Sequence, residues 1–311
     1  MKILLTSTSF QDTPGKHHDA LNETGFIIDT LRGPVKEDVL LPIIAKYDGV
    51  ICGDDHYTRK VIEKGKAGKL KVISKYGIGL DKIDLKAALK YEIKVTNCPG
   101  VNHMAVAEHI WALILAFYKN IPDEINYTRN GKWERLIGHE IFGKNIGVAG
   151  LGRIGKEVLL RAKSFGLKLY AFDISIDKTF VQKNNVNVCE TLEKLMMVTD
   201  IVSLNMNLTQ DNNQFVNNNI IENHTKEGLL LINTARGELV DEEAILYGIK
   251  NNILSGYLTD VLNIEPMVKN HPFTKQNKIL ITPHIGSRTY ESVCRQGVMA
   301  VNNLVSSFKE I

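Results

Sequence analysis

The sequence has few cysteines, no long apolar run and no terminal block of charge. Its four cysteines are far apart and show no C-x-x-C spacing, so we expect reduced, buried thiols and predict no metal site. The opening stretch, MKILLTSTSF, has too short an apolar run for a signal peptide, and no run of about 18 apolar residues predicts a membrane span. These absences favour a cytoplasmic protein.

A large excess of charge of one sign is also lacking. The formal net charge is +3, with acids and bases intermixed, so neither nucleic acid nor an anionic membrane is predicted as a partner. The small positive excess weakly favours small anionic substrates. A chain of 311 residues that is 44% hydrophobic is long enough for a sizeable core, and two domains are expected rather than one.

What the sequence does contain is a stretch, residues 144–173, with the order of a dinucleotide-binding βαβ unit. An apolar run at residues 146–149 precedes the pattern G-x-G-x-x-G, and a second apolar run ends in Asp173. Gly150 would allow the tight turn, Gly152 the approach of a pyrophosphate, and Gly155 close packing of helix on strand. The helix N-terminus would attract the phosphates, and Asp173 would accept the ribose hydroxyls. We therefore predict that NAD contacts Gly150, Gly152, Arg153, Ile154, Gly155 and Asp173.

Alternating strands and helices along the chain predict an α/β fold with parallel sheets. Helices are expected at residues 39–47, 106–117 and 289–308. Strands are expected at residues 3–5, 26–28, 49–52, 72–74, 94–96, 146–149, 167–172, 201–204, 229–232, 257–262 and 279–281, with Asp260 inside the tenth of these.

Chemically useful side chains follow several of these strands, and ligands bind beyond the carboxyl ends of parallel strands. Arg236 could pair in a bidentate manner with a carboxylate, or could serve the structure by pairing with Asp241 or Glu242. His284 could act as a general acid, although a single histidine after a strand is more often structural. Glu265 could orient an imidazole and favour its charged form, or be a surface glutamate. Together they supply a carboxylate anchor and a proton donor, which a 2-keto acid needs beside a nicotinamide.

Seven motifs make the sequence resemble the D-isomer-specific 2-hydroxyacid dehydrogenases, and most closely their D-3-phosphoglycerate dehydrogenase branch. They occur in the same order and at similar separations. The motifs are KYGIGLD at residues 75–81, VAE at 106–108, GKWER at 131–135, GLGRIG at 150–155, NTARG at 233–237, DVLNIEP at 260–266 and PHIG at 283–286.

This resemblance implies an NAD-dependent enzyme that transfers hydride to or from C2 of a small 2-keto or 2-hydroxy acid, with 3-phosphoglycerate among the candidates. It implies that Arg236 binds the substrate carboxylate and that His284 is the acid/base, with Glu265 as its partner. The further residues that it assigns are Lys75, Tyr76 and Gly77 for the substrate, and Asn207, Thr234 and Asp260 for the cofactor.

The resemblance also implies the architecture. Two doubly wound domains are expected, with an NAD-binding Rossmann domain at residues 99–286 inserted into a substrate domain at residues 1–98 and 287–311. The segment around Trp133 would form a dimer arm of the Rossmann domain, which makes a second copy of the chain the expected partner. No appended serine-sensing domain is expected after the last helix.

Three features depart from or refine the pattern. Asn205-Met206-Asn207 replaces the usual His-x-Pro, and Lys75 stands where phosphoglycerate enzymes often have arginine, whose fork lysine lacks. Glu265 argues against a formate dehydrogenase, which has glutamine there. A second hypothesis is a co-repressor that binds NAD(H) as a signal without significant turnover. The long disordered flanks that such a protein often carries are absent from the sequence.

Overall fold

The computed structural model describes residues 1–311, which divide into two compact units. Unit 1 consists of Met1–Asn102 and Ser287–Ile311, and unit 2 is the contiguous stretch His103–Gly286. The first boundary therefore lies after Asn102 rather than after residue 98. Each unit is built on one all-parallel sheet with helices on both faces, which confirms the predicted fold class.

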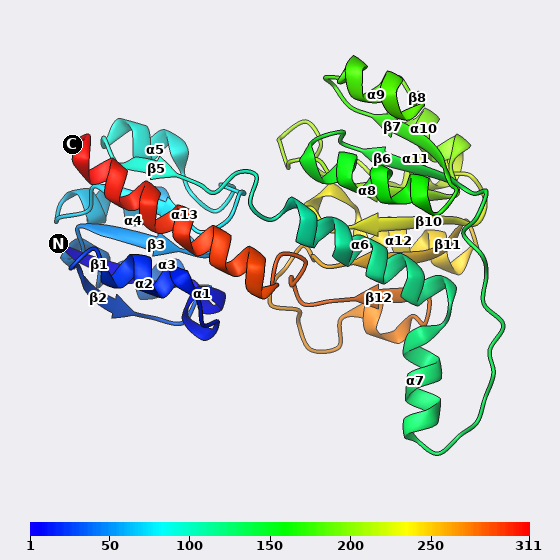
Figure 1. The fold of residues 1–311 in the computed structure, drawn as a ribbon, viewed down its shortest axis with the longest axis horizontal. Helices are drawn as coiled ribbons and strands as arrows, with labels where there is room; N and C mark the ends of the chain where they lie inside the picture. Colours follow the sequence, from blue (N-terminus) through cyan, green and yellow to red (C-terminus); the bar gives the residue numbers. More distant parts are fainter. The chain divides into compact units, whose positions relative to one another are not determined.

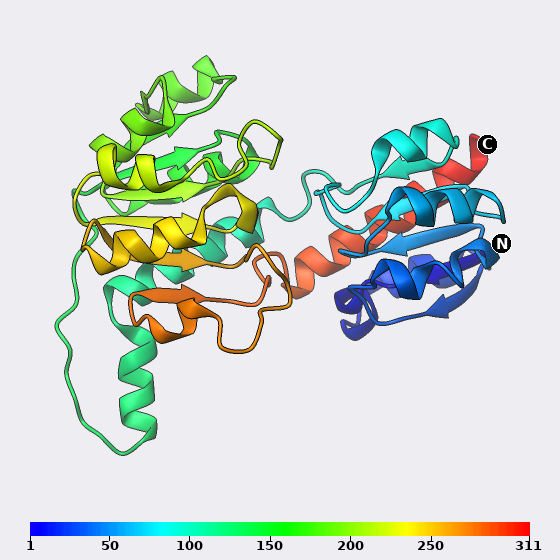
Figure 2. The ribbon, with the colours of Figure 1, turned by 180° about the vertical axis from the view of Figure 1, so that it is seen from behind.

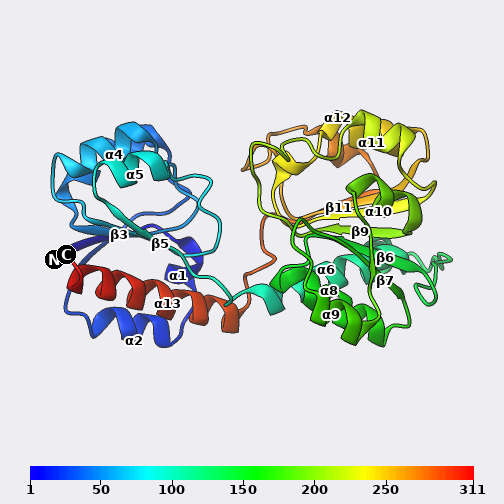
Figure 3. The same ribbon diagram turned by 90° about the horizontal axis from the view of Figure 1, so that it is seen from above.

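Unit 1 contains a five-stranded sheet of order β2-β1-β3-β4-β5. Helix α13 and α2 cover one face, and α4 and α5 cover the other (Figure 3). Both chain termini lie in this unit (Figure 2). Its elements are β1(Lys2–Leu5), α1(Thr8–Asp12), α2(Lys16–Asn22), β2(Ile27–Thr30), α3(Glu37–Leu40), η1(Ile44–Lys46), β3(Gly49–Cys52), α4(Arg59–Lys66), β4(Val72–Lys75), α5(Leu85–Lys90), β5(Lys94–Thr96) and α13(Tyr290–Lys309).

The C-terminal helix α13 belongs to unit 1 although it follows all of unit 2 in the sequence. Its attachment includes hydrogen bonds from Ser74 Oγ to Ala300 O (2.7 Å) and from Asn303 Nδ2 to Asn97 O (2.8 Å). Ser74 is fully buried in β4, so the first of these bonds forms in the core of the unit. The hydroxyl of Thr289 caps the start of the helix by accepting from Ser292 N (3.2 Å).

The helix expected at residues 39–47 is wrong in extent. The structure has the short helix α3, a turn, and the 3₁₀ helix η1 instead. Pro42 lies between them, where it lacks the N–H that a continuous helix would need, and its ring would clash with the carbonyl four residues earlier.

Unit 2 contains a seven-stranded sheet of order β12-β11-β10-β9-β6-β7-β8. Helices α6, α8 and α9 lie on one face, and α10, α11 and α12 on the other (Figure 3). Its elements are α6(His103–Tyr118), α7(Ile121–Arg129), β6(Asn145–Ala149), α8(Arg153–Ser164), β7(Lys168–Phe172), α9(Lys178–Asn184), β8(Asn187–Val188), α10(Leu192–Val198), β9(Ile201–Leu204), α11(Asn218–Asn223), β10(Leu229–Asn233), η2(Gly237–Leu239), α12(Glu242–Lys250), β11(Leu254–Thr259), η3(Pro272–Lys275) and β12(Ile279–Ile281).

The strand predicted at residues 257–262 is shifted. It is β11, which ends at Thr259, so that Asp260 lies just beyond the sheet. Val261 and Leu262 are buried, which made them look like strand residues, but they pack in the loop that follows. The backbone N–H of Asp260 still donates to Asn233 O (3.0 Å), while its side chain holds other segments.

Helix α7 and the segment that follows it extend away from the sheet of unit 2 (Figure 1). Trp133, Ile137 and Phe142 are 85%, 94% and 76% exposed on this segment. Such large apolar side chains rarely stay in water when they lie close together in the sequence.

All four cysteines are free thiols, as expected. Cys52, Cys98 and Cys189 are buried, but Cys294 is only partly buried, which corrects the expectation of four buried thiols. None of the helices has both the length and the apolar character needed to span a bilayer.

Candidate active site

A glycine-rich turn joins β6 to α8. Gly150 has φ +103°, a left-handed conformation that favours glycine. A Cβ there would lie 2.6 Å from Asn205 O, and one on Gly155 would lie 2.1 Å from Gly150 O, so neither position can carry a side chain. No atom lies within 4 Å of the place that a Cβ on Gly152 would occupy. Backbone atoms therefore fill the space beside the first and third glycines, while the space beside the second is empty, as the approach of a pyrophosphate requires.

Helix α8 starts directly after this turn. Arg153 and Ile154 are its first two residues. The N-cap residue before them is Gly152, which makes no side-chain capping hydrogen bond to the helix. The first amides of a helix lack intrahelical acceptors, and together with the helix dipole they attract anions. Both residues thus lie where the sequence predicted phosphate contacts.

Asp173 follows β7 and reaches back to the same turn. Its carboxylate accepts hydrogen bonds from Leu151 N (2.6 Å) and Ser175 N (2.8 Å). A carboxylate has about four acceptor positions, so further lone pairs remain for ribose hydroxyls. In the sheet, β6 lies between β7 and β9, which places the turn at the point where the strand order reverses. Ligands of open parallel sheets bind at such points.

Asn207 and Thr234 lie beyond the carboxyl ends of β9 and β10. These strands are direct neighbours, with Asn233 opposite Leu204. Asn207 O accepts from Asn212 Nδ2 (2.8 Å), which folds the loop after β9 back on itself. The structure therefore places both predicted residues at the same sheet edge as the glycine-rich turn, while their contacts with the cofactor stay predictions.

Arg236 lies on a loop that Asn233 shapes. Asn233 is fully buried; its Nδ2 donates to Arg236 O (2.8 Å) and its Oδ1 accepts from Ala235 N (3.1 Å). The Arg236 guanidinium donates from Nη1 to Ala235 O (2.7 Å). Asn233 belongs to the motif at residues 233–237, but no role was predicted for it; its signal is an amide residue at the end of an otherwise apolar strand.

The two acids considered as structural partners for Arg236 have other contacts. Asp241 caps α12 by accepting from Glu243 N (2.9 Å). Glu242 accepts from Asn263 N (3.1 Å) and contacts His271 Nε2 (3.2 Å).

The loops after β10, β11 and β12 meet. A Cβ on Gly237 would lie 2.1 Å from the carbonyl carbon of Leu262, so the Arg236 loop packs directly on the chain that leads to Glu265. Glu265 Oε1 accepts from Leu262 N (3.0 Å), and Glu265 Oε2 lies 2.7 Å from His284 Nδ1. The expected contact of carboxylate and imidazole is therefore present. Because Nδ1 is engaged, Nε2 is the nitrogen that faces other groups.

Asp260 holds the chain on both sides of His284. Its carboxylate accepts from Thr282 Oγ1 (2.6 Å), Ile285 N (2.9 Å) and Gly286 N (2.7 Å). Burial of Asp260 raises its pKa, but the nearby His109 imidazole and the hydrogen bonds from Thr282 and the two amides outweigh burial and leave the pKa below its usual value. Ionised Asp260 therefore stabilises the fold above the ordinary carboxyl pKa, and this contribution is lost as pH falls through the lowered value. Contact with the nicotinamide amide, which the resemblance implied, stays a prediction.

Lys75, Tyr76 and Gly77 lie in unit 1, at the end of β4 and just after it. The side chain of Lys75 is only 5% exposed, and its ammonium donates to Gly53 O (2.5 Å) and Asp54 Oδ1 (2.6 Å). The amide of Tyr76 donates to Cys52 O (2.8 Å), and its part in substrate binding stays a prediction. Burial raises the pKa of Tyr76 to about 12, so its hydroxyl stays protonated near neutral pH. Gly77 stays a candidate donor.

The model of the D-isomer specific 2-hydroxyacid dehydrogenase, NAD binding domain, matches residues 111–286. That is more than half of the chain and contains the whole glycine-rich turn and the Glu265–His284 pair. The chain belongs to this family.

Individual relatives support the same family for this 2-hydroxyacid dehydrogenase. The chain is 37% identical to a glyoxylate reductase of Thermofilum pendens over 89% of this chain and 83% of the relative. It is 33% identical to a D-3-phosphoglycerate dehydrogenase of Methanocaldococcus jannaschii over 98% of this chain but only 57% of that longer protein. The solved structure of the TT0316 protein from Thermus thermophilus superposes with a TM-score of 0.89, at 32% identity, covering 100% of this chain and 97% of the other.

The residues of the dehydrogenase fit NAD. The open space at Gly152 leaves room for a pyrophosphate against the backbone, and the uncapped start of α8 offers donors to it. Asp173 lies at the same turn with lone pairs to spare. The chain is an NAD-dependent oxidoreductase.

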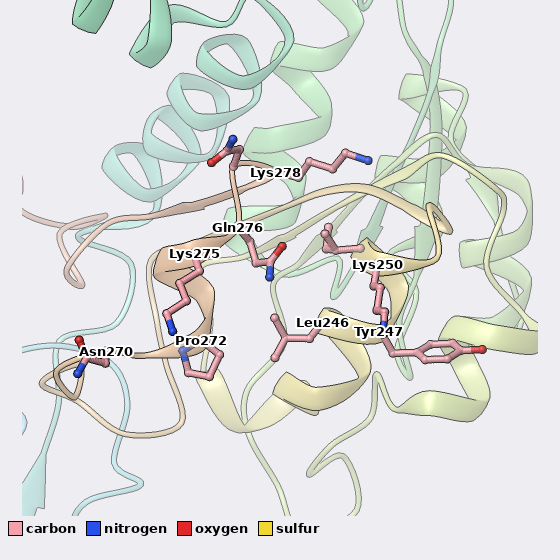
Figure 4. A pocket seen from close by; sticks show the side chains of 10 residues that line it. Leu246, Tyr247, Lys250, Asn270, Pro272, Lys275, Gln276 and Lys278 are labelled. Atoms are coloured by element: carbon pink, nitrogen blue, oxygen red, sulfur yellow. The ribbon is translucent and has the colours of Figure 1, made fainter.

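A cavity of about 660 Å³ lies elsewhere in the dehydrogenase (Figure 4). It is lined by Tyr247, Lys250 and Lys278, among others. Lys250 ends α12 before β11, and Lys278 directly precedes β12, so this cavity is at the amino ends of these strands. Glu265 and His284 follow the carboxyl ends of the same strands, and neither of them lines the cavity.

Proposed function

We propose that the enzyme interconverts a D-2-hydroxy acid and its 2-keto acid. The observation that carries this proposal is the 2.7 Å contact of Glu265 with His284. Bound NAD supplies the hydride acceptor or, in its reduced form, the donor. In reduction, His284 gives a proton from Nε2 to the keto oxygen, while Glu265 holds Nδ1 and stabilises the charged ring. In oxidation the same nitrogen takes the proton back.

Arg236 is the proposed anchor of the substrate carboxylate. Asn233 fixes the loop that carries it, and Gly237 packs that loop against the chain before Glu265. A guanidinium can hold a carboxylate through two parallel hydrogen bonds, which fixes orientation as well as distance. That Gly77 and Lys75 of unit 1 also contact the substrate stays a prediction from the family resemblance.

The substrate is proposed to be small, with glyoxylate, hydroxypyruvate and 3-phosphohydroxypyruvate as candidates. The names of the relatives in Thermofilum pendens and Methanocaldococcus jannaschii support glyoxylate and the phosphorylated acid, and a hydroxypyruvate reductase of Thermotoga maritima, 34% identical over 89% of this chain, supports hydroxypyruvate. The test is a screen of these 2-keto acids with NADH, followed at the nicotinamide absorbance. Turnover of none of them, with NADH binding intact, would contradict the proposal and favour the co-repressor hypothesis, which the enzymatic names of the relatives do not support.

Asp173 should set the preference for NAD over NADP. Its carboxylate would repel a 2′-phosphate, and Ile174, Ser175 and Ile176 after it bring no cation. Asp173→Ala should narrow the difference in kcat/KM between NADH and NADPH, and Asp173→Asn, which keeps an acceptor but not the charge, should narrow it too. Equal use of both cofactors by the unchanged enzyme would refute this role.

A two-fold dimer is proposed through the segment that carries Trp133 and Ile137, which are 85% and 94% exposed. Light scattering at micromolar concentration should give twice the mass of the chain. The double variant Trp133→Glu, Ile137→Asp should be monomeric, because charges cannot be buried unpaired in an interface. Leu89→Glu, at a site 83% exposed in unit 1, is the control and should stay dimeric. A monomeric unchanged protein would reject the arm as an interface.

We also propose a cytoplasmic location. The four free cysteines support it, since stable secreted proteins more often pair their thiols. Cell fractionation with an antibody against the chain would test the location.

A further inference from the structure

His109 is a partly buried histidine on α6 that the proposed reaction does not use. Its side chain is 16% exposed, and its Nε2 lies 2.9 Å from Thr282 Oγ1 and 3.5 Å from Asp260 Oδ1. Helix α6 opens unit 2, whereas Thr282 directly follows the last strand, 173 positions later. A side chain from the first helix therefore reaches the loop that carries His284.

The proton positions in this contact follow from the partners. Asp260 is ionised, because its pKa is lowered, and it can only accept. Thr282 has one hydroxyl proton, which it donates to Asp260 Oδ1 at 2.6 Å. The oxygen of Thr282 must then accept from His109, so the proton of His109 is on Nε2. The result is a directed chain of donors from His109 through Thr282 to Asp260.

This chain ends on the backbone around His284. Asp260 accepts from Ile285 N and Gly286 N, while His284 N donates to Asp260 O (2.9 Å) and Thr282 O (3.0 Å). His284 has φ +54°, a left-handed conformation that is uncommon for a residue with a side chain. The network holds the backbone of His284 in this conformation.

The ring of His109 also lies close to Gly286 in this loop. A Cβ on Gly286 would lie 3.5 Å from His109 Cδ2 and 3.0 Å from Asp260 Oδ2, so the imidazole and the carboxylate enclose this glycine. His109 therefore acts on the segment both by packing and through the hydrogen-bonded path. A mere filler of the same volume would supply the packing but not the donor.

We propose that His109 is a positioning residue, which holds the His284 segment in its reactive conformation by donating to Thr282 and thereby orienting Asp260. As a statement about catalysis this rests on the proposed function. As a statement about the loop it does not, because the loop can be observed without turnover.

The decisive comparison is between His109→Leu and His109→Gln. Leucine fills the space without a donor, whereas the amide nitrogen of glutamine can take the place of Nε2. His109→Leu should lower kcat by up to about 10²-fold with KM for NADH unchanged, since a small misplacement of a reacting group has costs of that order. His109→Gln should recover most of the loss. Glu108→Gln, on the neighbouring exposed position of α6, is the control and should behave as the unchanged enzyme.

Hydrogen–deuterium exchange of the Ile285 and Gly286 amides is the readout that needs no substrate. Exchange should be faster in His109→Leu and near normal in His109→Gln. Thr282→Val should match His109→Leu, Thr282→Ser should match the unchanged protein, and the double variant should be no worse than either single one. This second pair also tests the network if His109→Leu does not fold.

Equal behaviour of the leucine and glutamine variants in rate and exchange would overturn the proposal. So would additive losses in the double variant, or faster exchange throughout unit 2. If the unchanged protein turns over no 2-keto acid, the proposed function fails, while the exchange pattern still decides whether His109 holds the loop.

Discussion

His284→Ala should lower the rate of 2-keto acid reduction by about 10²–10⁴-fold, the usual contribution of a positioned general acid. Hydride arrival leaves negative charge on the substrate oxygen, and without the imidazole only water can neutralise it. NADH affinity should change little, because the glycine-rich turn and Asp173 lie on other strands of the sheet. Stopped-flow reduction and a fluorescence titration of NADH measure the two quantities separately. Loss of NADH binding in step with the rate would instead indicate a structural histidine.

The pH dependence tests the pairing of His284 with Glu265. Reduction needs the protonated ring, so its rate should fall as pH rises, while oxidation should rise over the same range. The carboxylate 2.7 Å from Nδ1 stabilises the charged ring and extends reduction to higher pH. Glu265→Gln keeps the shape but not the charge, so both transitions should move to lower pH with thermal unfolding unchanged. Profiles that do not move would return Glu265 to the role of a loop carboxylate.

The two residues should act as one unit. The double variant Glu265→Gln, His284→Ala should be little slower than His284→Ala alone, because Glu265 works only through the ring. Multiplied losses would mean that Glu265 touches the substrate by a separate route.

Arg236→Lys should lower kcat/KM by about 10²-fold or more, since lysine keeps the charge but cannot make two parallel hydrogen bonds. Both kcat and KM should worsen, because the fork orients the substrate as well as binding it. The loop itself should persist, as Asn233 binds the backbone of Arg236 and not its side chain. NADH affinity should barely change.

A substrate analogue sharpens the test of Arg236. The methyl ester of the best 2-keto acid lacks the carboxylate, so the unchanged enzyme should reduce it poorly and Arg236→Lys should add little to that loss. An equal further loss on acid and ester would show that the guanidinium supports the structure rather than the substrate.

Much of the fold could be predicted because parallel strands are buried on both faces and appear as apolar runs. The bounds expected for residues 49–52, 94–96, 201–204 and 279–281 match the structure. Two predicted elements differ from the structure for identifiable reasons. Pro42 divided an amphipathic stretch, and burial of Val261 and Leu262 in a loop imitated a strand.

The site could be predicted in part for a related reason. Residues such as Gly150 or His284 are placed by the strand just before them, so order along the chain gives their position. Contacts that need a distant partner leave no local pattern. The ammonium of Lys75 donates to Asp54. Thr282 donates to the carboxylate of Asp260 and is itself contacted by His109. The residues near each of these in the sequence gave no sign of these partners.

The place of α13 has a consequence for biosynthesis. Unit 2 is one continuous stretch and can fold as soon as it leaves the ribosome, because domains generally fold as units during synthesis. Unit 1 cannot fold completely at that stage. The hydroxyl of Ser74 donates to Ala300 O, 226 positions later, and the face of the sheet under α13 stays uncovered until that helix has been synthesised. The first part to be translated is thus the last to mature, and a nascent chain arrested before Ser287 should carry a folded NAD-binding unit beside an unfinished sheet that chaperones would recognise.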